Sequence, residues 1–262
     1  MAIEGVDYSF DRPVTPQALR DAGKVFACRY LAIPPNGKII DRQEADQLAG
    51  AGVWIVANWE QGGHGNTPPE QAAAQSLAQA RALGIPQGRP IYASVDFDVQ
   101  PAQYGQVRNW IERFHAGLAG EYDGRALYGS YFVLKAGFDE GWLAWGWQTY
   151  AWSYGHVEDR AQLYQYHNGV NVAGADCDLD RAQAADYGQW MPGRVPDGAG
   201  TTDEEEPMLV NIQGKGGVRN GGPHYIENGH ATFLGGQNIA GVPTLDFDQG
   251  TALAKVVTGI GG

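Results

Sequence analysis

The sequence predicts an α/β fold: a TIM-like β/α barrel of eight strands with reduced helices in its last three units, followed by a small Gly-rich C-terminal module that contains β-strands. The first observation is a series of eight apolar runs with the composition of short strands. The second is that helix signals separate the first five runs, as in repeated β-α units. The last three runs follow one another too closely for a crossover helix, so we expect a helix-poor wall to close the barrel.

The strand-like runs begin near the N-terminus and are rich in β-branched and aromatic residues. In chain order they are residues 3–9, 25–31, 53–59, 90–99, 125–131, 143–151, 161–166 and 173–177. The fourth run has the composition of a buried strand.

Four helices are expected between the early strands. The first runs from Thr15-Pro16 to Gly23, and the second begins after Asp41. The third runs from Thr67 to Gly84, and the fourth spans residues 103–118. Glu44 follows Asp41 by three residues and completes a capping box, which fixes the start of the second helix. Apolar residues recur at helical spacing in the fourth.

We expect three segments along the chain. Residues 1–191 form the barrel, residues 192–207 an acidic Pro/Gly linker, and residues 208–262 the small module. Within the module, short strands are expected at 208–212, 225–226 and 231–234, and a helix at 249–257. The module is poor in apolar residues, so we expect an attachment or assembly role in which it docks on the barrel, on another subunit or on a larger assembly.

Composition excludes several classes of partner. The formal net charge is −12, with no basic stripe, which speaks against nucleic acid and against adhesion to anionic membranes or wall polymers. No apolar run reaches the roughly 18 residues of a transmembrane helix, so we expect no membrane insertion. The N-terminus lacks a basic segment followed by an apolar one, so we expect no signal peptide.

The cysteines and histidines show no metal-ligand spacing. Cys28 and Cys177 lie far apart in apolar contexts, which favours free buried thiols over a disulfide. The six His are scattered. We therefore expect neither a metal nor a cofactor.

The acidic pair Asp96 and Asp98 ends the fourth strand-like run. Residues two apart on a strand share a face, and two buried acids side by side raise each other's pKa and are costly to desolvate. Two carboxyl groups at roughly this separation are what glycoside cleavage requires. The pair therefore indicates a sugar-processing or sugar-binding site, and the alternative is that both acids cap loops or pair with Arg.

Other acids end other strands of the predicted barrel. Asp7 ends the first strand, Glu60 follows the third, and Asp178 lies at the eighth between Asp176 and Asp180. Strand carboxyl ends meet at one face of such a barrel, so these acids are expected to converge there. Each has an alternative: Asp7 could cap a loop, Glu60 could be a solvated loop acid, and the acids around Asp178 could begin a following helix.

Aromatic and amide side chains are expected at the same rim. They are Tyr128, Tyr131, Trp147, Trp152, Gln165 and Tyr166. Sugar rings stack on such aromatic faces, although core packing is an equally good explanation for each of them.

Five segments in order resemble glycoside hydrolase family 25 lysozymes, and still more closely their bacterial and phage relatives, the glycoside-hydrolase-like domain of unknown function 1906. The segments begin at Gly5 (GVDYS), Phe26 (FACRY), Tyr92 (YASVDFD), Tyr164 (YQY) and Asp178 (DLD). The resemblance covers residues 1 to about 190 and leaves the C-terminal module outside. It implies an eight-stranded barrel with few late helices, a phage or actinobacterial origin, and cleavage between N-acetylmuramic acid and N-acetylglucosamine in peptidoglycan.

By position, the resemblance assigns catalytic roles to four acids. Asp7 matches the family's first-strand acid, Asp96 the first acid of its Asp-x-Glu pair, and Asp178 its last-strand acid. Asp98 stands where the lysozymes have the Glu that acts as general acid. Its side chain is one methylene shorter, and a misplacement of about 1 Å can cost on the order of 100-fold in rate.

Two functions follow. The first is a peptidoglycan hydrolase of the muramidase type. In it, Asp98 is the acid, Asp96 is the stabiliser or base, and Asp7 and Asp178 orient sugar and water. The residues expected to bind the glycan are Glu60, Tyr128, Trp147, Gln165 and Tyr166. The second is a barrel that binds wall glycan with little or no cleavage, in an envelope or virion-associated module. In either case we expect synthesis in the cytoplasm and action at the cell wall, after lysis as a phage lysin or as a virion component.

Overall fold

The computed structural model describes residues 3–10, 12–13, 15–60, 67–196 and four strands between 208 and 246. The chain divides into two compact units, Met1–Ala199 and Gly200–Gly262. Part of the segment expected to be a linker belongs to the first unit, because the backbone N–H of Gly193 donates to the carbonyl of Gly84 at 2.8 Å. The rest of that segment, residues 197–207, lies outside the described residues.

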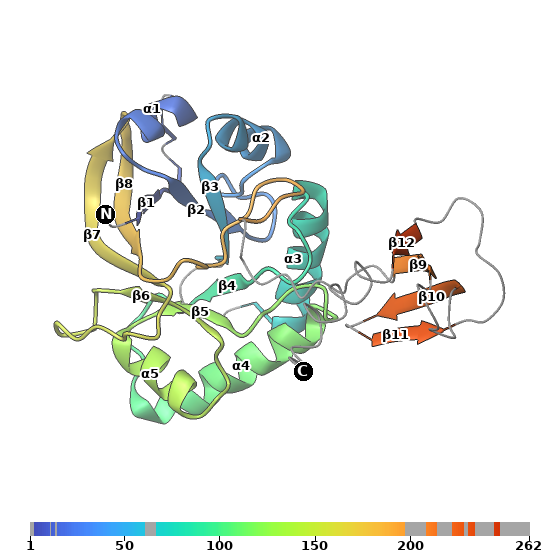
Figure 1. The fold of residues 1–262 in the computed structure, drawn as a ribbon. Helices are drawn as coiled ribbons and strands as arrows, with labels where there is room; N and C mark the ends of the chain where they lie inside the picture. The colour runs from blue at the N-terminus through green and yellow to red at the C-terminus, as the bar shows by residue number, and fades with distance from the viewer. Residues whose placement is uncertain are drawn as a thin grey trace. The chain divides into compact units, whose positions relative to one another are not determined.

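The first unit is a closed barrel of eight strands in sequence order, which confirms the predicted fold class (Figure 1). The strands are β1 Ile3–Asp7, β2 Phe26–Leu31, β3 Trp54–Trp59, β4 Ile91–Ser94, β5 Ala126–Gly129, β6 Trp145–Thr149, β7 Leu163–Val172 and β8 Ala175–Ala182. Neighbours from β1 to β7 are parallel, whereas β8 is antiparallel to both β7 and β1. The barrel is therefore mixed rather than wholly parallel.

The direction of β8 follows from a tight hairpin that the sequence analysis missed. Ala173 and Gly174 both have positive φ, 54° and 85°, and they connect the paired residues Val172 and Ala175. Two such residues form the turn that suits the twist of antiparallel strands. The polar residues after Tyr166 hid the length of β7, so two short separate strands were expected there instead of one hairpin.

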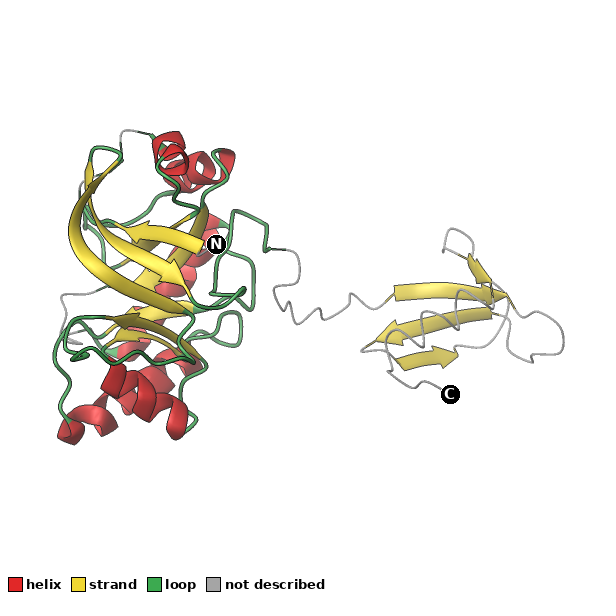
Figure 2. Cartoon of the chain, turned by 60° about the vertical axis from the view of Figure 1, so that its left-hand side comes forward, coloured by secondary structure: helices red, strands yellow, loops and turns green. Residues whose placement is uncertain are grey.

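Five helices connect the first six strands. They are α1 Pro16–Asp21, α2 Arg42–Gly50, α3 Pro69–Leu83, α4 Tyr104–Gly117 and α5 Tyr131–Asp139. The cap predicted for α2 is present, since the Asp41 side chain accepts a hydrogen bond from the backbone N–H of Glu44. Helix α5 was not expected, because the sixth strand-like run starts only about 18 residues after the fifth, which was judged too short a distance for a crossover helix. The helix fits because β5 has only four residues. Among the described residues of the barrel unit no helix follows β6, and β7 and β8 form the helix-poor wall (Figures 1 and 2).

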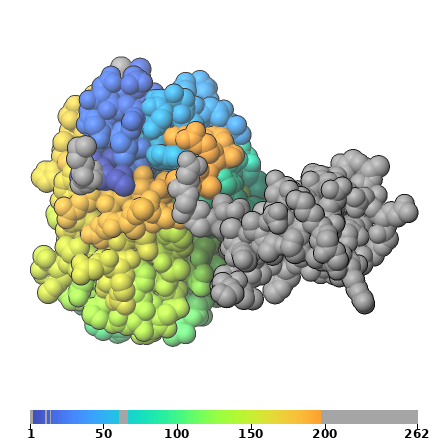
Figure 3. Space-filling model, viewed as in Figure 1, coloured from blue at the N-terminus to red at the C-terminus, as the bar shows by residue number. Residues whose placement is uncertain are grey.

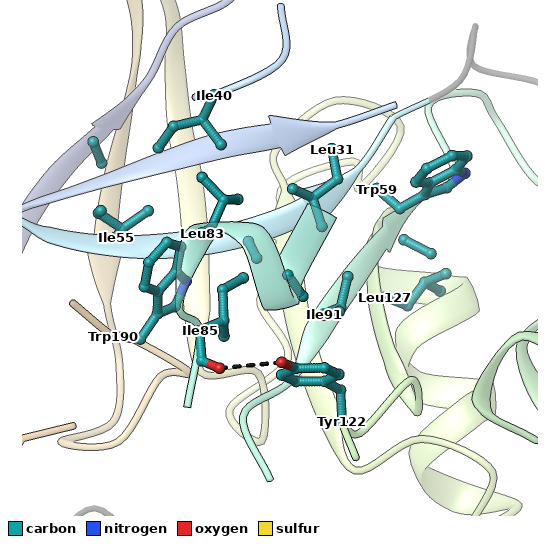
Figure 4. Packing of buried hydrophobic residues seen from close by; sticks show 14 of the residues in the cluster. Leu31, Ile40, Ile55, Trp59, Leu83, Ile85, Ile91, Tyr122, Leu127 and Trp190 are labelled. Carbon is teal, nitrogen blue, oxygen red and sulfur yellow. Dashed lines mark hydrogen bonds between the residues drawn. The ribbon is translucent and has the colours of Figure 1, made fainter. Parts of the chain in front are cut away.

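Two apolar clusters hold the barrel together. The larger one lies between the strands and the helices and includes Ile55, Ile91 and Trp190 (Figure 4). The smaller one fills the barrel interior, where Trp147 packs edge-on against Tyr128 with ring centroids 4.6 Å apart. Because the interior is packed with aromatic rings, only the end of the barrel is left for a site. Both cysteines are free and buried, as expected.

The strand that closes the barrel pairs with the first one. Five residues of β1 are in register with β8, from Ile3 opposite Ala182 to Asp7 opposite Asp178. Blue N-terminal atoms and the yellow-to-orange atoms of the closing segments accordingly share one face of the barrel unit (Figure 3). This pairing brings acids from the two ends of the barrel sequence together.

The second unit contains a four-stranded sheet in the order β11-β10-β9-β12. Its strands are β9 Met208–Gln213, β10 Gly222–Glu227, β11 His230–Phe233 and β12 Thr244–Asp246. The helix expected at residues 249–257 lies outside the described residues. No helix in the described part of the chain has the length and apolar character needed to span a membrane.

Candidate functional site

A cavity of about 260 Å³ lies where the parallel strands of the barrel end. Its wall is unusually acidic, with five carboxylates: Asp7, Glu60, Asp96, Asp176 and Asp178. The other lining residues are Ser9, Tyr30, Lys38, Asn58, Ser94, Tyr128, Trp147, Gln165 and Asn168. Each of the eight strands of the barrel contributes a lining residue, so the fold itself assembles the site.

Asp7 is the most deeply buried carboxylate of this wall, with 4% of its surface exposed. The Tyr30 hydroxyl donates to its Oδ1 at 2.6 Å, and Gln165 Nε2 donates to its Oδ2 at 2.7 Å. Burial, followed by the negative charge of Asp178, raises the pKa of Asp7 from 3.8 to about 7, although the hydrogen bonds favour the ionised form. A carboxyl group with this pKa can both donate and accept a proton near neutral pH.

Asp180 lies directly beneath Asp7 and is fully buried. Trp147 Nε1 donates to its Oδ1 at 2.8 Å, while no nitrogen or hydroxyl donor reaches its Oδ2. Burial and then the charge of Asp7 raise the pKa of Asp180 well above its ordinary value. The interaction between the two carboxyl groups lowers the pKa of Asp7 and raises that of Asp180, so it favours a proton on Asp180 over one on Asp7.

Gln165 on β7 connects the acids. Its Nε2 donates to Asp7 and, at 3.3 Å, to Asp178 Oδ2. Its Oε1 accepts hydrogen bonds from the Tyr128 hydroxyl at 2.8 Å and from Thr149 Oγ1 at 2.9 Å. Because both donors hold the carbonyl end of the amide, the NH₂ end is directed at the two carboxylates.

Asp178 lies on β8, and a hydrogen bond from β7 fixes its side chain. The backbone N–H of Gly169 donates to its Oδ1 at 2.9 Å. Burial raises the pKa of Asp178, and the charges of Asp176 and Asp96 add to this effect. The three acids of β8 are thus strand residues, and the alternative that they begin a helix is wrong.

Among the described residues that line the cavity, Lys38 is the one cation. Lys38 Nζ lies 3.3 Å from Glu60 Oε1, and the ammonium group also lies 5.5 Å from the centroid of the Tyr30 ring. Glu60 is therefore neutralised by an ion pair, while the field of the remaining acids favours hydroxyl-rich or cationic groups over anions. Among the described residues, no group of three or more His, Cys, Asp or Glu is arranged to hold a metal ion.

The structure brings together seven of the nine residues that the sequence assigned to the site. They are Asp7, Glu60, Asp96, Tyr128, Trp147, Gln165 and Asp178. Sequence reasoning did not assign Tyr30, Lys38 and Asn58 to it. Polar side chains near the ends of β2 and β3 were a usable signal for Tyr30 and Asn58, whereas Lys38 lies in a loop that has no such pattern.

Asp98 and Tyr166 do not line the cavity. Strand β4 ends at Ser94, so Asp98 lies in the following loop, where strand alternation no longer fixes direction. Burial and then the charge of Asp98 raise the pKa of Tyr104, which places that carboxylate towards α4. Tyr166 follows the inward Gln165 and therefore points outward, where its hydroxyl donates to Glu4 Oε2 at 2.6 Å.

Chemically, the arrangement offers a buried proton at Asp7 and Asp180, ionisable neighbours at Asp178 and Asp96, and several acceptors for hydroxyl groups. Acid–base work on a polar, uncharged ligand is the chemistry that suits such a set.

Residues 17–184 match the sequence model of a family described as Rv2525c-like, glycoside hydrolase-like domain. The Tat-secreted protein Rv2525c of Mycobacterium tuberculosis, in complex with L-tartrate, has a TM-score of 0.64 and 24% identity over 71% of this chain and 98% of its own. A bacterial lysozyme from Streptomyces coelicolor has a TM-score of 0.50 and 16% identity over 70% and 93% of the two chains. The autolysin LytC of Streptococcus pneumoniae, in complex with a synthetic peptidoglycan ligand, has a TM-score of 0.52 and 13% identity over 69% and 46%. No curated protein matches this chain. At these identities the structural likenesses show a shared fold.

Proposed function

The chain belongs to the Rv2525c-like glycoside hydrolase-like family, and we propose that its barrel binds bacterial peptidoglycan and hydrolyses the glycan in the manner of a muramidase. The observation that carries this proposal is the set of five carboxylates in one cavity, of which Asp7 has a pKa near 7. Glycoside hydrolysis needs one carboxyl group that is protonated and one that is ionised at the working pH. The lysozyme neighbours, which share the fold, support the choice of wall glycan as substrate.

In this proposal the burial or exposure of each acid determines its role in the reaction. Asp7 supplies the proton, because burial keeps its carboxyl group protonated in a large share of molecules near pH 7. Asp180 beneath it is the proton reserve that restores the acid. Asp96, which is exposed at the mouth of the cavity, stabilises positive charge that develops on the sugar.

Asp178 and Gln165 position the sugar and water in the cavity. Both are already oriented, Asp178 by the N–H of Gly169 and Gln165 by Tyr128 and Thr149. Tyr128 and Trp147 offer aromatic edges to the ligand from the floor. Asp98, which the resemblance matches to the lysozyme acid, receives no part in this scheme because it does not line the cavity.

One observation favours a second candidate, a barrel that binds glycan without cleaving it. The buried acid Asp7 is fully occupied by Tyr30, Gln165 and Asp180 in the absence of ligand. An acid so engaged must break a hydrogen bond before it can protonate a leaving group. In that case the cavity serves recognition only, within an envelope or virion-associated protein.

Two assays on insoluble, purified peptidoglycan separate these functions. Co-sedimentation measures binding, and release of soluble fragments with new reducing ends measures cleavage. A hydrolase shows both, a binding barrel shows the first alone, and a protein that shows neither contradicts the proposal. The Asp178→Asn variant, which retains the shape of the side chain, is expected to weaken binding in either case.

The place of action and the small module belong to the same proposal. We propose action at the cell wall, after lysis or as part of a virion, and attachment to a larger assembly through the module that begins at β9. The description of Rv2525c as Tat-secreted is consistent with a family whose members act outside the cytoplasm.

A further inference from the structure

Exposed aromatic side chains gather where β5 and β6 end, in the loop from β6 to β7 and at the start of α5. Tyr150 and Tyr154 in the loop are 42% and 75% exposed. The ring centroid of Tyr154 lies 6.1 Å from that of Phe132, and the His156 ring stacks on Tyr131 with centroids 5.0 Å apart. Tyr131 and Phe132 are the first two residues of α5. We call these five residues the aromatic rim.

Hydrogen bonds fix the backbone that carries these rings. Ser153 Oγ donates to the carbonyl of Thr149 at 2.6 Å and accepts a hydrogen bond from the backbone N–H of Tyr131 at 2.9 Å. Gln148 Nε2 donates to the carbonyl of His156 at 2.8 Å. The loop is therefore bonded both to β6 and to the start of α5, so its shape is set before a ligand binds.

The backbone of this loop is also strained. Trp152 and Tyr154 have positive φ, 54° and 49°. A bulky side chain in this left-handed region costs free energy that Gly would avoid, and such strain concentrates at functional sites. Burial does not offset the strain at Tyr154, because 75% of its surface is exposed. The placement of the Tyr154 ring is therefore better explained by contact with a ligand than by packing of the barrel.

The aromatic rim adjoins the cavity of five carboxylates, which we call the acidic cavity. Tyr150 directly follows Thr149, whose Oγ1 donates at 2.9 Å to Gln165, a residue that lines the cavity. Tyr131 is three residues after Tyr128, which lines the cavity too. The cavity volume of about 260 Å³ is smaller than the roughly 300–1,000 Å³ of sites that enclose a drug-sized ligand. A glycan strand that enters it therefore leaves most of its sugars at the surface beside the mouth.

We infer that the aromatic rim binds the sugars of a peptidoglycan strand that lie next to the sugar in the acidic cavity, by stacking of their rings on Tyr150 and Tyr154. This inference rests on the proposed function and extends its binding site beyond the cavity. The faces of a pyranose ring carry C–H groups, which pack against an aromatic face while the hydroxyl and acetamido groups at the edge of the sugar stay in water. A partly exposed aromatic ring suits such a ligand.

A protein partner fits this surface less well. Within the described loop, Val157 is the one exposed large aliphatic residue beside the rings, at 37%. The buried centre of a protein interface is more apolar than this. We therefore assign the aromatic rim to the glycan, and the test below includes a second copy of the chain as the other occupant.

Two glycan fragments of different length test the inference on the full chain. One is the disaccharide of N-acetylglucosamine and N-acetylmuramic acid. The other is the tetrasaccharide of two such units, joined by a thioglycosidic bond that resists hydrolysis during the titration. Calorimetry measures both affinities. We expect the tetrasaccharide to bind on the order of tenfold more tightly, because its additional sugars bury apolar surface on the aromatic rim.

Substitutions locate this gain. Tyr150→Ala and Tyr154→Ala should each lower the affinity for the tetrasaccharide on the order of fivefold and leave that for the disaccharide within about twofold of wild type. Tyr154→Phe keeps the ring and should bind both fragments as wild type does. Val157→Ala, which changes an exposed apolar residue of the same loop outside the aromatic rim, is the matched control and should also bind as wild type does. Thermal unfolding checks that each variant folds.

The outcomes separate this inference from the proposed function. The inference is wrong if wild type shows no preference for the tetrasaccharide, if the preference survives Tyr154→Ala, or if that variant weakens both fragments equally. It is also wrong if Tyr154→Ala binds glycan normally but abolishes a dimer that wild type forms in light scattering. In each of these cases the proposed function stands. If neither fragment binds to wild type, the inference fails, and co-sedimentation with whole peptidoglycan decides whether the proposed function fails with it.

Discussion

Asp7 and Asp178 are directly opposite each other in the antiparallel pair of β1 and β8, and both line the acidic cavity. Directly opposite residues of such a pair have their side chains on the same face, about 5 Å apart at Cβ. Like charges in this position destabilise a sheet, and here Asp180 adds a third carboxyl group that interacts with both of them. The barrel thus closes on a concentration of negative charge that its stability does not require.

The first prediction concerns stability against pH. The pKa of Asp7 is raised to about 7 by folding, so between about pH 4 and 7 the folded state holds a proton that the unfolded state has lost. The stabilising effect of this proton is complete below about pH 4 and is lost as the pH rises to 7, by at most about 1.4 kcal/mol for each pH unit. Denaturant unfolding should therefore show lower stability at pH 8 than at pH 5. Asp7→Asn should flatten this dependence, and an unchanged slope would show that Asp7 is not the titrating group.

A second prediction separates the two assignments of the proton donor. Asp98→Asn should leave peptidoglycan cleavage within about twofold of wild type, because Asp98 does not line the cavity. Asp98→Glu, which restores the arm length of the lysozyme acid, should likewise have little effect. Digestion rates of the three proteins on one peptidoglycan preparation decide the point. Loss of cleavage in Asp98→Asn together with a gain in Asp98→Glu would return the role of general acid to Asp98.

A third prediction concerns the orientation of Gln165. Tyr128→Phe and Thr149→Val each remove one of the two hydroxyl groups that donate to its Oε1. We expect each variant to lose about 1 kcal/mol of stability and several-fold in glycan affinity. The double variant should lose more affinity than the sum, because the amide is then free to turn its NH₂ group away from Asp7 and Asp178. Strict additivity in a double-mutant cycle would contradict this account of the network.

A fourth prediction addresses the division of the chain. Residues 197–207 contain four consecutive acids and few apolar residues, which favours protease access. Limited proteolysis should give a folded fragment that ends near residue 196 and retains wild-type affinity for glycan. The same fragment should associate with a larger assembly more weakly than the full chain does, because it lacks the small module. A fragment that keeps its fold but loses glycan affinity would show that the small module takes part in binding.

The sequence was sufficient for the barrel and for most of the cavity, for identifiable reasons. The positions of the strands followed from apolar runs, and the acids that end β1 and lie in β8 followed from the rule that strand ends converge. The direction of β8 did not follow, because the turn residues Ala173 and Gly174 were taken for the start of a strand. Asp98 was misplaced for a related reason: strand periodicity was extended past Ser94, where the strand ends.

Parts of the site depend on long-range contacts that no local pattern reveals. Lys38 reaches the cavity from a loop, and its partner Glu60 follows a different strand. The raised pKa of Asp7 depends on burial by the closed barrel and on Asp178, far away in the sequence. Such features become visible only once the first and last strands are paired.

The most direct test of the central claim compares wild type and Asp7→Asn on purified peptidoglycan near pH 7. The products are reduced with borohydride, and mass spectrometry identifies the sugar at each new reducing end. We predict new N-acetylmuramic acid ends with wild type and at least a 100-fold lower rate with Asp7→Asn, whose fold is checked by circular dichroism. The account would be contradicted if folded wild type releases no new reducing ends, or if Asp7→Asn cleaves as fast as wild type.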